Sequence, residues 1–195
     1  MRKSIGVLAA VTVVLVAPAA DAETWYAGGF GGLNYTHDGA VNGSGISASY
    51  DLGFAAGGYA GFYVKENIRL EGELSYRAND LDTRGGVAIA GEAEALALML
   101  NAFFDFKLES IVEPYLGAGI GIADVDYRIG GLQYDDTVLA IQMVAGAGIE
   151  IAPATQLTVD YRLFMTDDLK VGGGVGFGSV EYTNSAVMVG LRKSF

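Results

Sequence analysis

The sequence contains no cysteine, one histidine, and only 12 lysine and arginine residues against 23 aspartate and glutamate residues. Without cysteine no disulfide can form, and the absence says nothing about the redox compartment. The formal net charge of −11 excludes a nucleic-acid-binding protein, because such a protein needs a basic footprint. Beyond residue 20 no apolar run is long enough for a membrane-spanning helix. If the chain crosses a membrane, it must therefore do so with strands.

The N-terminus has the pattern of a secretory signal peptide. Arg2 and Lys3 form a positive end, an apolar segment runs from Ile5 to Ala17, and residues 20–22 form an A-x-A cleavage site. The apolar segment is too short for the alternative, an uncleaved helical anchor. We predict a signal peptide over residues 1–22 and, at this chain length, a single domain over residues 23–195.

The stretch from Val138 to Phe164 shows which secondary structure the domain uses. Apolar residues alternate with small or charged residues on both sides of a turn at Pro153. Successive side chains of a strand point to opposite faces, so each run has one apolar face. A soluble sheet buries that face in a core, whereas a membrane barrel shows it to lipid. The 29 glycines are poor for helices and tolerable in curved sheets.

Eight strands are predicted. They are Trp25–Tyr35, Ser49–Val64, Ile68–Arg77, Ala93–Phe106, Pro114–Tyr127, two within Val138–Phe164, and Tyr182–Phe195. The fourth is rich in Ala, Leu, Met and Glu, which also favour a helix. We assign it as a strand because the neighbouring strands need a partner there.

The predicted connections alternate in length along the chain. Short ones lie at Lys65–Asn67, Lys107–Glu113 and Ala152–Thr155, and long ones at Thr36–Ala48, Ala78–Glu92, Arg128–Asp136 and Met165–Glu181. Outer-membrane barrels have short periplasmic turns and longer external loops. Aromatic residues gather at both ends of the strands, as at two lipid–water interfaces. These patterns predict an all-β fold, an eight-stranded antiparallel up-and-down transmembrane β-barrel in the bacterial outer membrane, with both termini periplasmic.

If the apolar faces point to lipid, charged residues point into the barrel. We predict a lumenal ion-pair network, because an unpaired buried charge is costly. Its members are Arg69, Glu71, Glu73, Arg77, Glu150, Asp160 and Arg162. Two interpretations of the network stay open: a purely structural one, and a gate that opens a narrow pore when the pairs swap.

No catalytic, cofactor-binding or metal-binding residue is predicted. His37 lies beside Asp38 at the start of a long loop, and no spacing joins it to a nucleophile such as Ser44, Ser47 or Ser49. The paired aspartates of the long loops lack a calcium-ligand spacing, which favours solvated charge. They are Asp80 and Asp82, Asp135 and Asp136, and Asp167 and Asp168. We expect a protein that is not an enzyme and carries no cofactor.

Several segments resemble known outer-membrane proteins. TWYAGGFGGLNYTHD (24–38) and AGAGIEIAPATQLTVDYRLF (145–164) are similar to strands of the transmembrane domain of outer-membrane protein A. RLEGELSYR (69–77), LNAFFDF (100–106) and EPYLGAGIGIA (113–123) resemble more closely the outer membrane protein beta-barrel domain family, which includes porin-like small surface antigens. The resemblance covers residues 23–195. It implies that Phe195 is the terminal residue of an assembly signal, although Lys193 stands where such signals are usually apolar or aromatic.

The resemblance and the residue pattern lead to one main expectation about function. It is a non-enzymatic integral outer-membrane protein with an envelope-structural role, or a surface adhesion or antigen role through external loops. The alternative is a narrow, low-conductance porin for ions or small solutes. Expected partners are outer-membrane lipid and lipopolysaccharide, the barrel-assembly machinery, and a host-surface or other extracellular ligand. We expect a monomer.

Overall fold

The computed structural model describes residues 25–36, 48–50, 52–84, 87–129, 132–166, 169–171, 178–180 and 183–195. The strands of these segments are β1 (Trp25–Thr36), β2 (Ala48–Tyr50), β3 (Leu52–Lys65), β4 (Ile68–Arg84), β5 (Val87–Asp105), β6 (Val112–Ile129), β7 (Leu132–Ala152), β8 (Thr155–Thr166), β9 (Leu169–Val171), β10 (Gly178–Val180) and β11 (Thr183–Ser194). None of the described segments is a helix of the length and hydropathy needed to cross a membrane.

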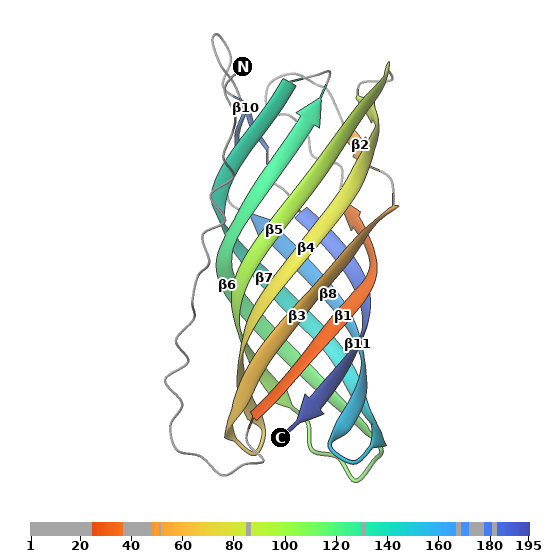
Figure 1. Ribbon diagram of the computed structural model, residues 1–195, viewed down its shortest axis with the longest axis vertical. Coiled ribbons are helices and arrows are strands. Elements are labelled where there is room, and N and C mark those ends of the chain that lie inside the picture. Colours follow the sequence, from red (N-terminus) through yellow and green to blue (C-terminus); the bar gives the residue numbers. More distant parts are fainter. Residues whose placement is uncertain are drawn as a thin grey trace.

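Eight of these strands close into a barrel (Figure 1). Each pairs antiparallel with its neighbours in the order β1, β3, β4, β5, β6, β7, β8 and β11, and β11 returns to β1. The predicted eight-stranded up-and-down barrel is confirmed. β5 is a strand throughout, although its composition also suits a helix, because it completes the ladders of β4 and β6.

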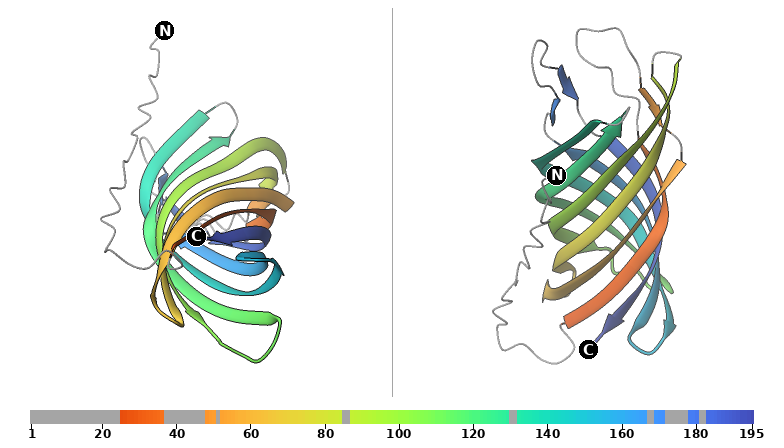
Figure 2. Two further views of the ribbon diagram at one scale, coloured as in Figure 1. Left: turned by 60° about the horizontal axis from the view of Figure 1, so that its bottom comes forward. Right: turned by 45° about the horizontal axis from the view of Figure 1, so that its top comes forward.

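The two ends of the barrel differ. At the turn end, β3–β4, β5–β6 and β7–β8 are joined by short connections, and the chain terminates there at Phe195 (Figure 1). At the opposite end, which we call the hairpin end, the β4–β5 ladder continues to Arg84–Val87 and the β6–β7 ladder to Ile129–Leu132. β4 and β5 therefore rise well beyond β1 (Figure 2).

This extension corrects two of the predicted long loops. Ala78–Glu92 and Arg128–Asp136 consist mostly of paired strand. The prediction was wrong because it relied on alternating apolar residues. Backbone hydrogen bonds between strands continue beyond the lipid, where neither face of the strand has to be apolar. Of the other two long connections, Met165–Glu181 includes the β9–β10 pair, and most of Thr36–Ala48 lies outside the described residues.

Apolar side chains form a band around the outside of the barrel. On β5 it includes Leu96, Leu100 and Phe104, which are between 43% and 60% exposed. Aromatic pairs lie near both margins: Trp25–Phe62 and Phe104–Phe106 toward the turn end, Phe54–Tyr76 toward the hairpin end. Three further aromatic side chains at the ends of predicted strands, those of Tyr50, Tyr127 and Tyr182, lie outside the described residues. An exposed apolar band with aromatic margins is the surface that a bilayer covers.

Glycines inside the barrel make room for aromatic rings. Five inward aromatic side chains stand directly opposite a glycine of the neighbouring strand: Tyr26–Gly61, Phe30–Gly57, Tyr59–Gly28, Phe103–Gly117 and Tyr115–Gly146. A Cβ atom added at any of these glycines would collide with the facing ring. Each ring therefore occupies space that only a glycine leaves free on the neighbouring strand.

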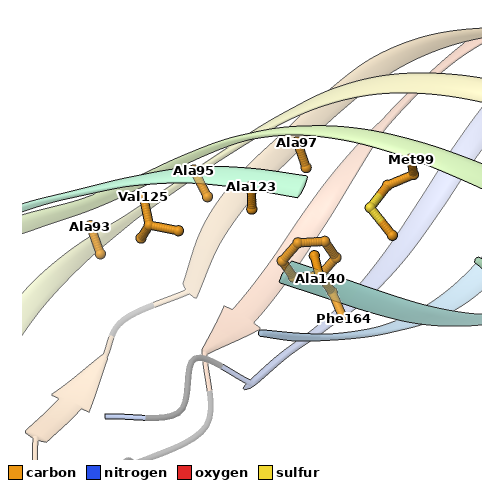
Figure 3. Packing of buried hydrophobic residues seen from close by; sticks show 8 residues of the cluster. All are labelled: Ala93, Ala95, Ala97, Met99, Ala123, Val125, Ala140 and Phe164. Carbon is orange, nitrogen blue, oxygen red and sulfur yellow. The ribbon is translucent and has the colours of Figure 1, made fainter. Parts of the chain in front are cut away.

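The hairpin half of the interior has an apolar wall (Figure 3). Small residues dominate this cluster, which consists of Ala93, Ala95, Ala97, Met99, Ala123, Val125, Ala140 and Phe164. Inward charges were predicted from the sequence, but this apolar part was not. Alanine occurs on either face of a strand, so its position does not indicate which face is buried. Most of the inward charge lies in the middle and the turn half of the barrel, and Arg77 is the charged residue that reaches the apolar wall, over the Phe164 ring.

Candidate functional site

Two strands that face each other across the barrel supply most of the inward charge. β4 contributes Arg69, Glu71, Glu73 and Arg77 at every second position, and β8 contributes Asp160 and Arg162. Each of these side chains is at most 4% exposed. The period of two in a strand places all of them on the inner face. β4 and β8 are not neighbours, so their charges meet across the interior rather than along one ladder.

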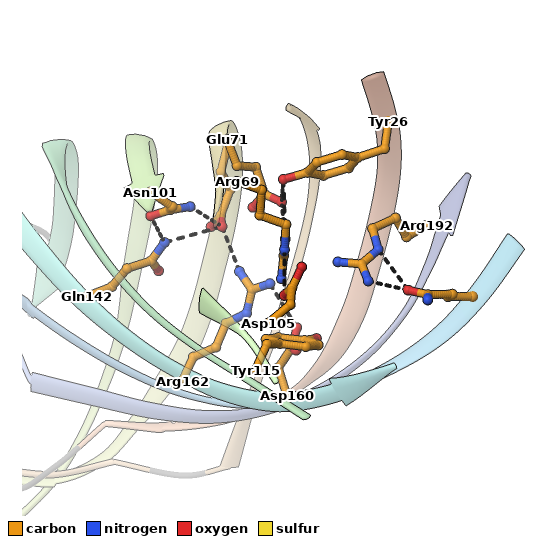
Figure 4. Close-up of polar contacts among 12 residues, drawn as sticks. Tyr26, Arg69, Glu71, Asn101, Asp105, Tyr115, Gln142, Asp160, Arg162 and Arg192 are labelled. Atoms are coloured by element: carbon orange, nitrogen blue, oxygen red, sulfur yellow. Dashed lines mark hydrogen bonds and ion pairs between the residues drawn. The ribbon is translucent and has the colours of Figure 1, made fainter. Parts of the chain in front are cut away.

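Arg162 is the centre of the first cluster (Figure 4). Its Nη1 lies 2.7 Å from Glu73 Oε2 on the opposite wall, and its Nη2 lies 2.9 Å from Asp160 Oδ2. The guanidinium also stacks over the Phe30 ring at 3.8 Å. Tyr115 donates a hydrogen bond to Asp160 from the other side. The guanidinium is thus held by two carboxylates and one aromatic face.

Arg69 is the centre of the second cluster, nearer the turn end. Its Nε lies 3.0 Å from Asp105 Oδ1 and its Nη1 lies 3.2 Å from Glu71 Oε2. Tyr26 accepts a hydrogen bond from the same Nη1 at 3.2 Å and donates one to Glu71 at 3.2 Å. The Arg69 guanidinium stacks over the Phe103 ring at 3.9 Å. This ring is one of those accommodated by a facing glycine.

Amide side chains extend the network in both directions. Toward the hairpin end, Gln142 Nε2 donates to Asn101 Oδ1 at 2.7 Å, and both amides donate to Glu73 Oε2. Toward the turn end, Arg192 donates to Gln156, and Gln156 donates to Glu113 at 2.8 Å. Sequence analysis missed these amides and Arg192. Arg192 could have been predicted from the alternation of β11. It has the inward phase, whereas its neighbours Leu191 and Lys193 have the outward phase.

Two of the predicted network residues lie apart from these clusters. Arg77 is fully buried, stacks over the Phe164 ring at 4.0 Å and donates to Ser75 Oγ at 3.0 Å. Glu150 is exposed, so the structure does not place it in the lumenal network. The β7–β8 register shifts between Glu150 and Ala152, beside the turn, where the strand has already left the lumen. Glu150 lines a groove of about 400 Å³ at the turn-end rim.

Almost no space remains beside the two charge clusters. The cavity between Arg69, Arg162 and Arg192 has a volume of about 10 Å³, enough for about one water molecule. An eight-stranded barrel has an interior just wide enough to be filled by side chains, and large ones fill it here. At this level the paired side chains fill the interior.

Most of the remaining candidate residues from the sequence lie outside the described part of the chain. His37, Asp38, Ser44, Ser47, Asp167 and Asp168 lie outside the described residues, as do the side chains of Ser49, Asp80 and Asp82. Asp135 is exposed and Asp136 is half-buried, both on β7 beyond the apolar band. Among the described residues, no group of three or more His, Cys, Asp or Glu side chains is placed to hold a metal ion.

Comparisons with known proteins place the chain among outer-membrane barrels. The family model described as "Outer membrane protein beta-barrel domain" matches residues 7–192. "Putative adhesin RC1281" of Rickettsia conorii is 23% identical over 168 residues, which are 73% of this chain and 68% of the relative. "Outer membrane protein" of Gluconacetobacter diazotrophicus is 26% identical over 169 residues, 74% of this chain but only 42% of that longer protein.

A solved structure agrees with this at the level of the fold. The crystal structure of Neisserial surface protein A has a TM-score of 0.58 and 19% identity, and the match covers 88% of this chain and 97% of that one. The strand order, the apolar band and the family match all agree. The chain therefore belongs to the outer membrane protein beta-barrel domain family and is an integral protein of the bacterial outer membrane.

Proposed function

We propose that this protein is a non-enzymatic surface protein that contacts molecules outside the cell through the hairpin end of its barrel. The assignment of the hairpin end to the exterior is supported by the β4–β5 and β6–β7 hairpins that rise there and by the two long connections, 37–47 and 167–182, at the same end. The β4–β5 and β6–β7 hairpins extend past the last lipid-facing residues, so they stand in water and are accessible to a partner.

One observation carries the proposal: at the level of the two charge clusters, paired charges fill the interior. Arg162 joins Glu73 to Asp160, and the space left beside the pairs is about 10 Å³. A narrow pore, the alternative function, needs a continuous water path along the axis. The filled interior favours a rigid support for the hairpins over that alternative. The name of the Rickettsia conorii relative supports a role in adhesion.

The proposal is tested by measuring flux and adhesion with one set of variants. The refolded barrel should give no discrete conductance steps in planar lipid bilayers. Cells that display it should adhere to host-cell surfaces, and shortening the β6–β7 hairpin by residues 127–134 should abolish that adhesion. Glu66→Ala, on the β3–β4 turn at the other end, is the matched control and should adhere normally. Conductance steps that change with Arg162→Ala, together with unchanged adhesion, would establish the pore instead.

Lipid surrounds the barrel in the outer membrane, and we propose more specific partners as well. These are lipopolysaccharide in the outer leaflet and the barrel-assembly machinery, which we expect to recognise Phe195 after cleavage of residues 1–22. The Phe195 backbone N–H donates to Trp25 at 2.9 Å, and its ring is 62% exposed. Lys193 reaches the β7–β8 turn and donates to Pro153 O at 3.0 Å. We further propose that the barrel is a monomer.

A further inference from the structure

Each of the two charge clusters inside the barrel has more carboxylates than guanidinium groups. The ion pairs join one guanidinium to two carboxylates in each cluster: Arg69 to Glu71 and Asp105, and Arg162 to Glu73 and Asp160. Both clusters therefore have one carboxylate in excess. Because an uncompensated buried charge is costly, the excess requires a positive charge nearby.

Arg192 is a buried guanidinium with the opposite excess. It is 3% exposed, and it donates its hydrogen bonds to the neutral side chain of Gln156. Among the described residues, no carboxylate lies within ion-pair distance of this guanidinium. Figure 4 shows Arg192 set apart from both clusters, with its dashed lines leading away from them. The missing counter-charge of Arg192 and the excess carboxylates of the clusters are thus complementary.

The cavity of about 10 Å³ lies between these groups. Its lining includes Arg192, Glu71 of the first cluster and Asp160 of the second. The hydroxyl groups of Thr158 and Tyr59 also line it, and neither has a hydrogen-bond partner among the described residues. Thr158 is only 2% exposed, so bulk water does not reach it. Glu71 Oε1 accepts no hydrogen bond from a described residue either, because Arg69 and Tyr26 both donate to Oε2.

The charges of the lining determine which occupant fits the cavity. An anion there would face the carboxylates of Glu71 and Asp160, and a metal ion would face three guanidinium groups. Both contacts join like charges in an interior of low dielectric constant, where repulsion is strong. A cavity of this volume holds about one water molecule. Water can accept hydrogen bonds from a guanidinium and a hydroxyl and donate two to carboxylates, so it suits both kinds of group.

We propose that one water molecule occupies this cavity and bridges Arg192 to the carboxylates of Glu71 and Asp160. It accepts hydrogen bonds from Arg192 and Thr158, and it donates to Glu71 Oε1 and to Asp160. The bridge joins Arg192 and the two clusters into one network across β4, β8 and β11. Arg192 then offsets part of their excess negative charge. This inference concerns the interior and does not depend on the proposed contact with molecules outside the cell.

The first test is a crystal structure of the refolded full chain, grown from a rubidium bromide solution and at a resolution that shows ordered water. We expect one density peak in the cavity, within hydrogen-bond distance of Arg192, Glu71 and Asp160, and no anomalous signal there. An anomalous signal of bromide or rubidium in the cavity would overturn the proposal, since the occupant would then be an ion. A cavity without a density peak would overturn it as well.

A double-mutant cycle tests whether Arg192 and Glu71 are coupled across the cavity. Arg192→Gln and Glu71→Gln each leave an uncompensated charge, whereas the double variant removes both charges. Its unfolding equilibrium constant should therefore be about tenfold smaller than the two single effects together predict. Urea unfolding of the refolded barrel in lipid vesicles gives these constants. Additivity within about twofold would overturn the proposal, because residues without a shared partner behave additively.

The matched control replaces Arg192→Gln by Lys193→Gln in the same cycle. Lys193 is the next residue of β11, but it is exposed and has the outward phase. Lys193→Gln and Glu71→Gln should be additive within about twofold. Equal coupling in both cycles would overturn the proposal, because the coupling would then not depend on the cavity. The crystal structure of the unmodified chain decides the question even where a variant does not fold.

Discussion

Arg162 shows how a single side chain connects distant parts of the barrel. It bonds Glu73 on β4 and Asp160 on β8, strands that lie on opposite walls, and it is 2% exposed. Two buried carboxylates thus share one guanidinium as their ion-pair partner. Burying such a pair yields little net stability, but removing one partner leaves an uncompensated charge in the interior.

At this scale, Arg162→Ala should lower the free energy of unfolding by about 3–5 kcal/mol. Urea unfolding of the refolded barrel in lipid vesicles measures the change. Arg128→Ala is the matched control, since Arg128 pairs with Glu92 and Glu94 but is about half exposed. Its loss should cost about 0–1 kcal/mol. Equal losses for the two variants would contradict the role of burial.

Inward-facing and outward-facing glycines of the strands differ in what an added side chain would meet. Gly117 of β6 faces inward, and an added Cβ atom would run into the Phe103 ring of β5. Gly72 of β4 faces outward, and the nearest atom to an added Cβ is the Ala60 carbonyl oxygen at 4.0 Å. The first glycine is required for packing between β5 and β6, whereas the second is not required within the barrel.

At the scale of the strand pair, Gly117→Ala should destabilise the barrel by about 1–3 kcal/mol, because the Phe103 ring has to leave its place over β6. Gly72→Ala should be neutral or stabilising by up to about 1 kcal/mol, since glycine is entropically costly in a strand. Chemical unfolding in micelles compares the two. A larger loss at Gly72 than at Gly117 would refute this account of the interior.

The position of the barrel in the bilayer follows from where its outer face changes from apolar to polar residues. On β6 and β7, Ile122 and Leu139 are succeeded by Asp124 and Thr137 toward the hairpin end. Leu100 lies in the middle of the apolar run of β5 and is 60% exposed. The hairpins beyond Asp124 and Thr137 therefore stand in water, which is also the condition for a partner outside the cell to reach them.

At the scale of the molecule, Leu100→Arg should make folding into lipid vesicles less favourable by about 2–4 kcal/mol, because the charge enters the hydrocarbon region. Thr137→Arg should change it by less than about 0.5 kcal/mol, as a surface substitution in water does. Folding titrations in vesicles measure both. Similar penalties at the two positions would show that the bilayer boundary lies elsewhere.

Properties that depend on local alternation could be predicted from the sequence. The eight strands and the lipid-facing side of Leu100 and Ile141 follow from a period of two, which any strand obeys regardless of its partners. Their up-and-down order was predicted from the alternating lengths of the connections. The extent of β4 to β7 could not be predicted, because outside the lipid neither face has to be apolar. Glu150 has the inward phase of β7, but phase does not reveal where the lumen ends.

The sequence by itself determined that the chain forms strands with an apolar outer face and a charged inner face, because this periodicity is present residue by residue. Only the tertiary structure decided that Arg162 meets Glu73 across the interior, that Phe103 needs Gly117, and that β4 to β7 extend beyond the other strands. Each of these depends on the register between strands. Register is set by the closure of the whole ring, and no short stretch of sequence contains it.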